Sequence, residues 1–249
     1  MNVRSRCFLA ALAGGMLASA IVLDASMRVG LSSPQYAGPI VTQPSYAPDG
    51  REVAFWTDWR GRSEIWAVST VDGRLRPIVD GIEPAWSPNG SWIAIVSSRG
   101  GNNIWLVRPD GSGLAQLTQS TTSLTRDDQP AWSPDGTQIA FISNRAGTGG
   151  IWITDVKGTG LRRITNPNLP RSWSRPRFSP DGRQIVLSED VCSKAGAGYL
   201  CEGSHLLIMN ADGTGLQQLT TDGFDDSNPS WGPRGILFDS NRFGSWALN

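Results

Sequence analysis

The sequence predicts an all-β protein, a β-propeller of four-stranded blades, and three observations lead to this fold class. A Pro-x-aromatic-x-Pro-x-Gly unit recurs along the chain, its copies are spaced like propeller blades, and no segment has a sustained helical period. The copies open at Pro44, Pro84, Pro130, Pro176 and Pro229, which lie 40, 46, 46 and 53 residues apart. A repeat of this length made of short strands is typical of propeller blades rather than of helical repeats.

Each repeat divides into four short strands. The Pro-x-Trp piece is the predicted inner strand, and the Pro-Asp-Gly turn after it combines the fixed φ of Pro with the positive φ that Gly permits. A short apolar run, such as residues 139–142, is the second strand, and an Ile-Trp pair marks the third. Asp-Gly turns lead to a fourth strand, which ends in Leu-Thr or Ile-Thr at residues 117–118, 164–165 and 219–220.

The ends of the chain predict how the ring closes. Four repeats are complete, whereas the last lacks a fourth strand. Residues 39–42, ahead of the first repeat, resemble residues 77–79, the predicted fourth strand of that repeat. We therefore predict that residues 39–42 complete the last blade and close a ring of five, since such pairing removes exposed strand edges. The alternative is part of a six- or seven-bladed ring.

The N-terminal residues differ from the repeats. Arg4 and Arg6 precede an apolar run that ends in small residues at positions 18–20, which is the layout of a secretory signal peptide. We predict a signal peptide over residues 1–20, a linker over residues 21–36 and the propeller over residues 37–249, in a periplasmic or secreted protein. A retained membrane anchor is the alternative, although the run is short for a bilayer span.

Charge and cysteine content limit the classes of partner and cofactor that the sequence predicts. Lysine and arginine together number 22, as do aspartate and glutamate, so the sequence predicts no binding to nucleic acid, and contact with a membrane only through a retained signal. In an oxidising compartment, Cys192 and Cys201 are predicted to form a disulfide. A metal site at this pair is disfavoured because the chain has a single histidine, and we predict no metal and no other cofactor.

The repeats resemble a known family. The Pro-x-Trp-Ser-Pro-Asp-Gly units, followed by an Ile-Ala-Phe strand and an Ile-Trp strand, look like the WD40-like (PD40-type) propeller repeats of TolB and its relatives over roughly residues 39–249. The resemblance implies a periplasmic propeller that docks protein partners at the mouth of its central channel. TolB carries an α/β domain before its propeller, whereas this sequence passes from the signal to the repeats, so we expect a TolB-like propeller rather than TolB.

The predicted strand directions place the candidate binding residues. Short uniform turns lie on one face, whereas loops of variable length, at residues 119–129, 166–175 and 192–201, lie on the other, which favours binding there. Residues just before each inner strand should surround the channel mouth on this variable face. They are Glu83, Asp127, Asp128, Arg175, Asp225 and Asp226.

This mainly acidic ring is expected to receive a basic segment or a cation. For Asp127 and Asp226, three residues before a repeat proline, the alternative is structural pairing with a recurring loop arginine. Recurring tryptophans are assigned to the core, whereas Trp59, Trp92 and Trp173 do not recur and are candidates for exposed contact, Trp173 first among them. The loop arginines are Arg60, Arg99, Arg145 and Arg242.

The predicted function is binding of a protein or peptide partner in the cell envelope. No Gly-x-Ser-x-Gly elbow occurs and His205 is the single histidine, so the sequence favours a binding protein over an enzyme and predicts no catalytic residues. The alternative partner is a glycan, bound by a lectin or a carbohydrate-active enzyme that uses Asp128, Asp226 and Arg175.

Overall fold

The computed structural model describes residues 41–120, 122–169, 172–195, 198–232, 234–242 and 247–248. These residues form strands and turns, which confirms the predicted all-β fold class. Within this part of the chain, no helix has the length and apolar character that crossing a membrane requires. The predicted signal peptide and linker lie outside the described residues.

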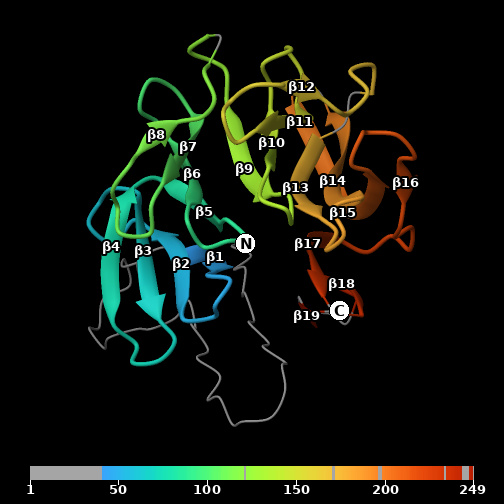
Figure 1. The fold of residues 1–249 in the computed structure, drawn as a ribbon. Coiled ribbons are helices and arrows are strands. Elements are labelled where there is room, and N and C mark those ends of the chain that lie inside the picture. Colours follow the sequence, from blue (N-terminus) through green and yellow to red (C-terminus); the bar gives the residue numbers. More distant parts are fainter. Residues whose placement is uncertain are drawn as a thin grey trace.

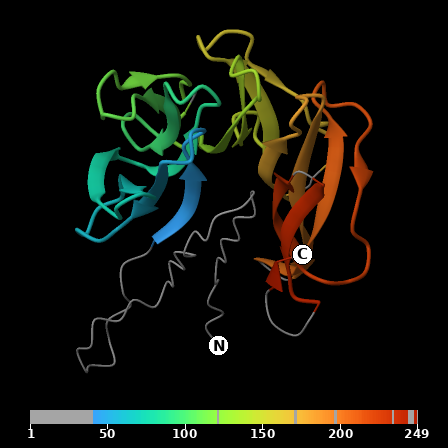
Figure 2. The ribbon, with the colours of Figure 1, turned by 60° about the horizontal axis from the view of Figure 1, so that its bottom comes forward.

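Five antiparallel sheets follow one another along the chain and stand around a common axis, with the first strand of each sheet innermost (Figures 1 and 2). The first four have four strands each, and three strands of the fifth are described. The strands are β1 (Val41–Tyr46), β2 (Glu52–Thr57), β3 (Glu64–Ser69) and β4 (Leu75–Asp80); β5 (Ile82–Trp86), β6 (Ile93–Ser97), β7 (Asn103–Val107) and β8 (Ala115–Gln116); β9 (Asp127–Trp132), β10 (Gln138–Ser143), β11 (Gly150–Asp155) and β12 (Arg162–Arg163); β13 (Ser172–Phe178), β14 (Gln184–Ala195), β15 (Gly198–Asn210) and β16 (Gln217–Gln218); and β17 (Asp226–Gly232), β18 (Gly235–Ser240) and β19 (Ala247–Leu248).

Apolar cores lie between consecutive sheets. Ile65 of the first sheet meets Ile95 of the second, and Ile104 of the second meets Phe141 of the third, all fully or almost fully buried. The repeated tryptophans pack against these clusters, which confirms their assignment to the core; they include Trp86, Trp105, Trp132 and Trp152. Each sheet therefore depends on its neighbour to cover one face.

The inner strands begin earlier than predicted. Each contains its repeat proline instead of starting there, and its pairing with the second strand shifts in register at that point. The shift is a β-bulge, in which two residues stand opposite one, and it accommodates a proline that has no N–H for the ladder. Most residues predicted to precede the inner strands consequently lie within them.

This extension changes the predicted ring closure. Val41 and Thr42 pair with Thr57 and Trp56 of β2, so they begin the inner strand of the first sheet. Their assignment to the fourth strand of the last blade is therefore wrong, while residues 39 and 40 lie outside the described part of the chain. The number of blades in the ring stays a prediction.

The outer strands end earlier than predicted, and at their ends a threonine hydroxyl replaces one backbone acceptor of the ladder, while the neighbouring backbone N–H still donates to the third strand. The N–H of Ile104 donates to Thr118 Oγ1 at 2.9 Å, and that of Ile151 to Thr165 Oγ1 at 3.1 Å. The fourth sheet repeats this bond at Thr220. Strands β8, β12 and β16 accordingly stop before the Leu-Thr and Ile-Thr pairs.

The insertion at residues 192–201 continues the fourth sheet. Strands β14 and β15 extend beyond the length of the other second and third strands and form a long hairpin. Their register places Cys192 directly opposite Cys201.

Candidate functional site

The residue before the repeat proline has a positive φ in all five inner strands. These residues are Gln43, Glu83, Gln129, Arg175 and Asn228, with φ between 52° and 58°. A side chain in this left-handed region costs roughly 1–2 kcal/mol, so the bulge must hold each of them there. Strain of this kind, repeated at the inner edge of every sheet, marks the axis as the candidate site.

Hydrogen bonds join these positions from sheet to sheet. Glu83 accepts from Gln43 Nε2 at 2.9 Å and from the backbone N–H of Gln129 at 2.6 Å, using one carboxylate oxygen for each. Gln129 Oε1 accepts from the backbone N–H of Arg175 at 2.6 Å. The predicted site residue Glu83 therefore links three inner strands, and both of its oxygens are occupied.

Asp127 and Asp226 are fully buried in ion pairs rather than displayed at the mouth. Arg145 Nη2 lies 2.5 Å from Asp127 Oδ2, and Arg242 Nη2 lies 2.8 Å from Asp226 Oδ2. The structural alternative is confirmed for both residues, with two of the predicted loop arginines as partners. The ring therefore presents two fewer acidic groups than the sequence suggests.

Trp173 occupies the same repeat position as these two aspartates, three residues before the proline. All three of these side chains are buried, and Trp173 is 4% exposed in the cluster between the third and fourth sheets. Its predicted exposure is therefore wrong. Of the other two non-recurring tryptophans, Trp59 is 60% exposed, and Trp92 is partly buried against the apolar cluster between the second and third sheets.

Asp225 lies at the end of the loop before β17. Its carboxylate accepts a short hydrogen bond from Ser204 Oγ of the fourth sheet, and its backbone N–H donates to Asn241 Oδ1 at 2.9 Å. Asp225 thus ties the fifth sheet to the base of the long hairpin.

Asp128 is half-buried on β9 and faces other charges. Burial raises its pKa to about 6, Glu83 and Asp127 act in the same direction, and Arg126 opposes them. Among the described residues, no three His, Cys, Asp or Glu side chains come together to hold a metal ion. Burial is therefore the main influence on the pKa of Asp128.

Arg177 is a charged residue at the axis that the sequence analysis missed. It follows Pro176 at a position where the other inner strands have alanine or serine, and an alignment of the repeats would have revealed it. Burial lowers the pKa of Arg177 to about 10, repulsion by Arg175 adds to this, and attraction by Glu83 opposes it. Arg177 lies on β13 of the fourth sheet and Glu83 on β5 of the second, which are not consecutive sheets.

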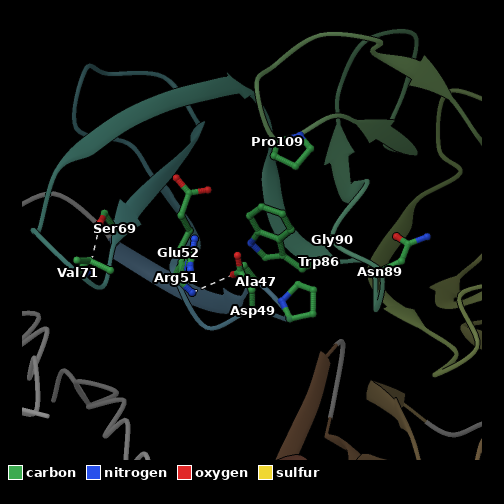
Figure 3. A pocket seen from close by; sticks show the side chains of 11 residues that line it. Ala47, Asp49, Arg51, Glu52, Ser69, Val71, Trp86, Asn89, Gly90 and Pro109 are labelled. Atoms are coloured by element: carbon green, nitrogen blue, oxygen red, sulfur yellow. Dashed lines mark hydrogen bonds between the residues drawn. The ribbon is translucent and has the colours of Figure 1, made fainter.

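A second candidate is a pocket of about 560 Å³ between the first two sheets, on the face of the short turns (Figure 3). Glu52 and Trp86 lie on its walls. Glu52 is already paired with Arg76 at 2.6 Å, and the same arginine donates to the carbonyl of Pro109 at the rim. The carboxylate of Glu52 is therefore already neutralised within the fold, which makes the axis the stronger candidate.

The raised pKa of Asp128 predicts a pH dependence of stability. The folded state binds this proton more tightly than the unfolded chain. Its contribution to the free energy of unfolding is therefore fully present below about pH 4 and is lost as the pH rises through about 6. We expect Asp128→Asn to remove this loss, worth about 1 kcal/mol after screening by solvent. Urea unfolding of both proteins between pH 4 and 8 measures it; parallel stability curves would contradict the assignment.

Comparison with known proteins gives a consistent picture. A profile of the TolB beta propeller domain matches residues 81–248. The Tol-Pal system protein TolB of Anaeromyxobacter dehalogenans (strain 2CP-C) is 36% identical over 83 residues, which cover 32% of this chain and 19% of that protein. The uncharacterized peptidase YuxL of Bacillus subtilis (strain 168) is 25% identical over 159 residues, 60% of this chain and 22% of the peptidase. The chain thus spans about a fifth of these curated relatives.

A solved structure shows the same fold. The crystal structure of TolB from Acinetobacter baumannii matches with a TM-score of 0.66 at 20% identity, covering 84% of this chain and 51% of that one. Since the family profile also matches more than half of the sequence, the chain belongs to the TolB β-propeller family.

Proposed function

We propose that this chain is an exported TolB-like scaffold that binds a segment of a protein or peptide partner at the axis and on the variable loop face. The hydrogen bonds that run from Gln43 through Glu83 and Gln129 to Arg175 support this, because they join polar groups of four inner strands. Asp128 on β9 and Arg175 on β13 lie on two of these strands. A charged segment lying along the axis would meet several sheets at once.

The loops beside the axis support a protein partner. The connections before β9 and β13 and the long β14–β15 hairpin differ in length, whereas the opposite face has short turns. Variable loops on a rigid scaffold are common binding elements. The curated TolB relative is named as a Tol-Pal system protein, and a partner in a multiprotein envelope system agrees with this arrangement.

Export and the Cys192–Cys201 disulfide belong to the same proposal. Residues paired across antiparallel strands have Cα atoms about 4.5–5.5 Å apart, within the range that a disulfide spans. In a periplasmic fraction, we expect these cysteines to react with maleimide only after reduction. Reaction before reduction would contradict the bond, and recovery of the chain only from the cytoplasm would contradict export.

A cross-linking experiment tests partner binding. Leu124 on the variable face is 79% exposed, and Val71 on the short-turn face is 81% exposed, so they form a matched pair of sites for benzoylphenylalanine. In envelope extract, we expect irradiation to give a discrete adduct from position 124 and none from position 71. Equal adducts from both faces, or none from position 124, would argue against the proposal.

One observation supports the glycan alternative. Asp128, with its pKa raised to about 6, has the character of a general acid, whereas Asp226 is withdrawn into its ion pair with Arg242. Binding to a glycan array that Asp128→Asn abolishes would favour this function over the protein-binding one.

A further inference from the structure

The fourth inner strand, β13, contains two arginines, whereas the other four inner strands contain none. Arg175 occupies the positive-φ position, and Arg177 follows two residues later. In the other sheets, the position of Arg177 holds a residue too small to reach across; these residues are Ser45, Ala85, Ala131 and Ser230. The repeat architecture therefore does not require a cation at this place.

Among the described residues, no carboxylate pairs directly with either guanidinium, although Glu83 attracts Arg177 and Asp239 attracts Arg175. Arg177 Nη1 donates to the carbonyl of Pro176 at 2.9 Å, and within the described residues neither arginine makes an ion pair. The nearby carboxylates have other partners: Glu83 accepts from two neighbouring strands, and Asp239 accepts from Asn228 Nδ2 at 2.9 Å.

Two like charges in a partly buried position are costly without an anion. Burial and mutual repulsion both act on Arg177, which nevertheless remains protonated at neutral pH. Buried charges in proteins are usually paired, and a guanidinium offers a fork of N–H donors that matches a carboxylate. An anionic group supplied from outside would remove the repulsion and use these donors.

We propose that Arg175 and Arg177 form a carboxylate-binding site at the axis, and that the segment bound there carries an acidic side chain. This inference rests on the proposed function and specifies its partner. It reverses the sequence-based expectation of a basic segment, because arginines neutralise two members of the acidic ring, Asp127 and Asp226, and both carboxylate oxygens of Glu83 already accept hydrogen bonds.

The repeats themselves supply variants that should fold. Arg175→Gln introduces the residue present at Gln43 and Gln129, which adopt the same positive φ. Arg177→Ala introduces the residue present at Ala85 and Ala131. Arg183→Ala is the matched control, since it removes the same charge from a side chain of the same sheet that is 86% exposed.

Fluorescence anisotropy tests the proposal with three labelled octapeptides. In these peptides alanine alternates with glutamate, with glutamine or with lysine. We expect the glutamate peptide to bind the wild type at least about tenfold more tightly than the other two. Arg175→Gln and Arg177→Ala should each weaken that binding about tenfold, as the loss of one charge-assisted pair predicts, whereas Arg183→Ala should have little effect.

Two results of this binding assay would overturn the proposal. One is equal affinity for the glutamate and glutamine peptides, and the other is an effect of Arg183→Ala as large as that of Arg177→Ala. The cross-link from position 124 separates this inference from the proposed function. An adduct that persists unchanged in both arginine variants leaves the scaffold function in place and refutes the carboxylate site, whereas failure of the scaffold function removes the adduct from the wild type as well.

Discussion

Replacing Asp127 by alanine is expected to lower the free energy of unfolding by about 3–5 kcal/mol, because the change leaves a buried cation without its counter-ion. Asp127 is fully buried, and the side chain of Arg145 is 6% exposed. The guanidinium also lies over the ring of Trp152, 5.3 Å from its centroid, and contacts Ser143, so the fold holds it in place after the aspartate is lost. Urea unfolding at neutral pH measures the loss.

The fifth sheet provides a matched comparison. Asp226 has the same repeat position, but Arg242 is 24% exposed and also pairs with Asp222 at 3.2 Å. Water and a second carboxylate can compensate this arginine, so Asp226→Ala should cost less, about 1–2 kcal/mol. Equal losses at the two sites, or a loss below about 1 kcal/mol for Asp127→Ala, would show that burial of the arginine does not determine the cost.

The sequence predicts the sheets well because their signals are local and repeated. Turn residues, apolar runs and Ile-Trp pairs specify each strand independently of its neighbours, and five copies reinforce one another. The pairing of Asp127 with Arg145 also follows from the repeat, since aspartate and loop arginine recur together in the third and fifth units. In the fourth unit a hairpin replaces that loop, and Trp173 fills the buried position instead.

The axis is less predictable from sequence. Glycine signals a positive φ in a sequence, whereas glutamine, glutamate and arginine do not. The sequence therefore predicts neither the bulges nor the links through Glu83. A proline, which lacks an N–H for the ladder, predicts the start of each strand, whereas the bulge lets the strand continue past it. Arg177 differs: its size at a position of small residues is visible in the sequence once the repeats are aligned.

Gly111→Ala is expected to destabilise the protein by about 1–3 kcal/mol more than Gly73→Ala. Both glycines follow an aspartate in the turn between the third and fourth strands, with φ of +86° and +71°. A Cβ at Gly111 would lie 2.7 Å from the carbonyl oxygen of Ile78 in the preceding sheet, so backbone must move, at a cost typical of overpacking. A Cβ at Gly73 meets nothing within 4 Å, and its substitution costs only the left-handed backbone, roughly 1–2 kcal/mol.

The difference between these two variants isolates the contact between sheets, because the turn and the backbone conformation are shared. The same contact recurs where Gly158 faces the carbonyl of Leu117 and where Gly213 faces that of Ile164, so this turn of the second, third and fourth sheets rests on the outer strand of the sheet before it or on the residue directly after that strand. Radial stacking therefore accounts for the extra cost at Gly111. Equal unfolding free energies for Gly73→Ala and Gly111→Ala would mean that the sheets do not press on one another at their outer turns, and that the inner strands and the apolar cores alone hold the arrangement together.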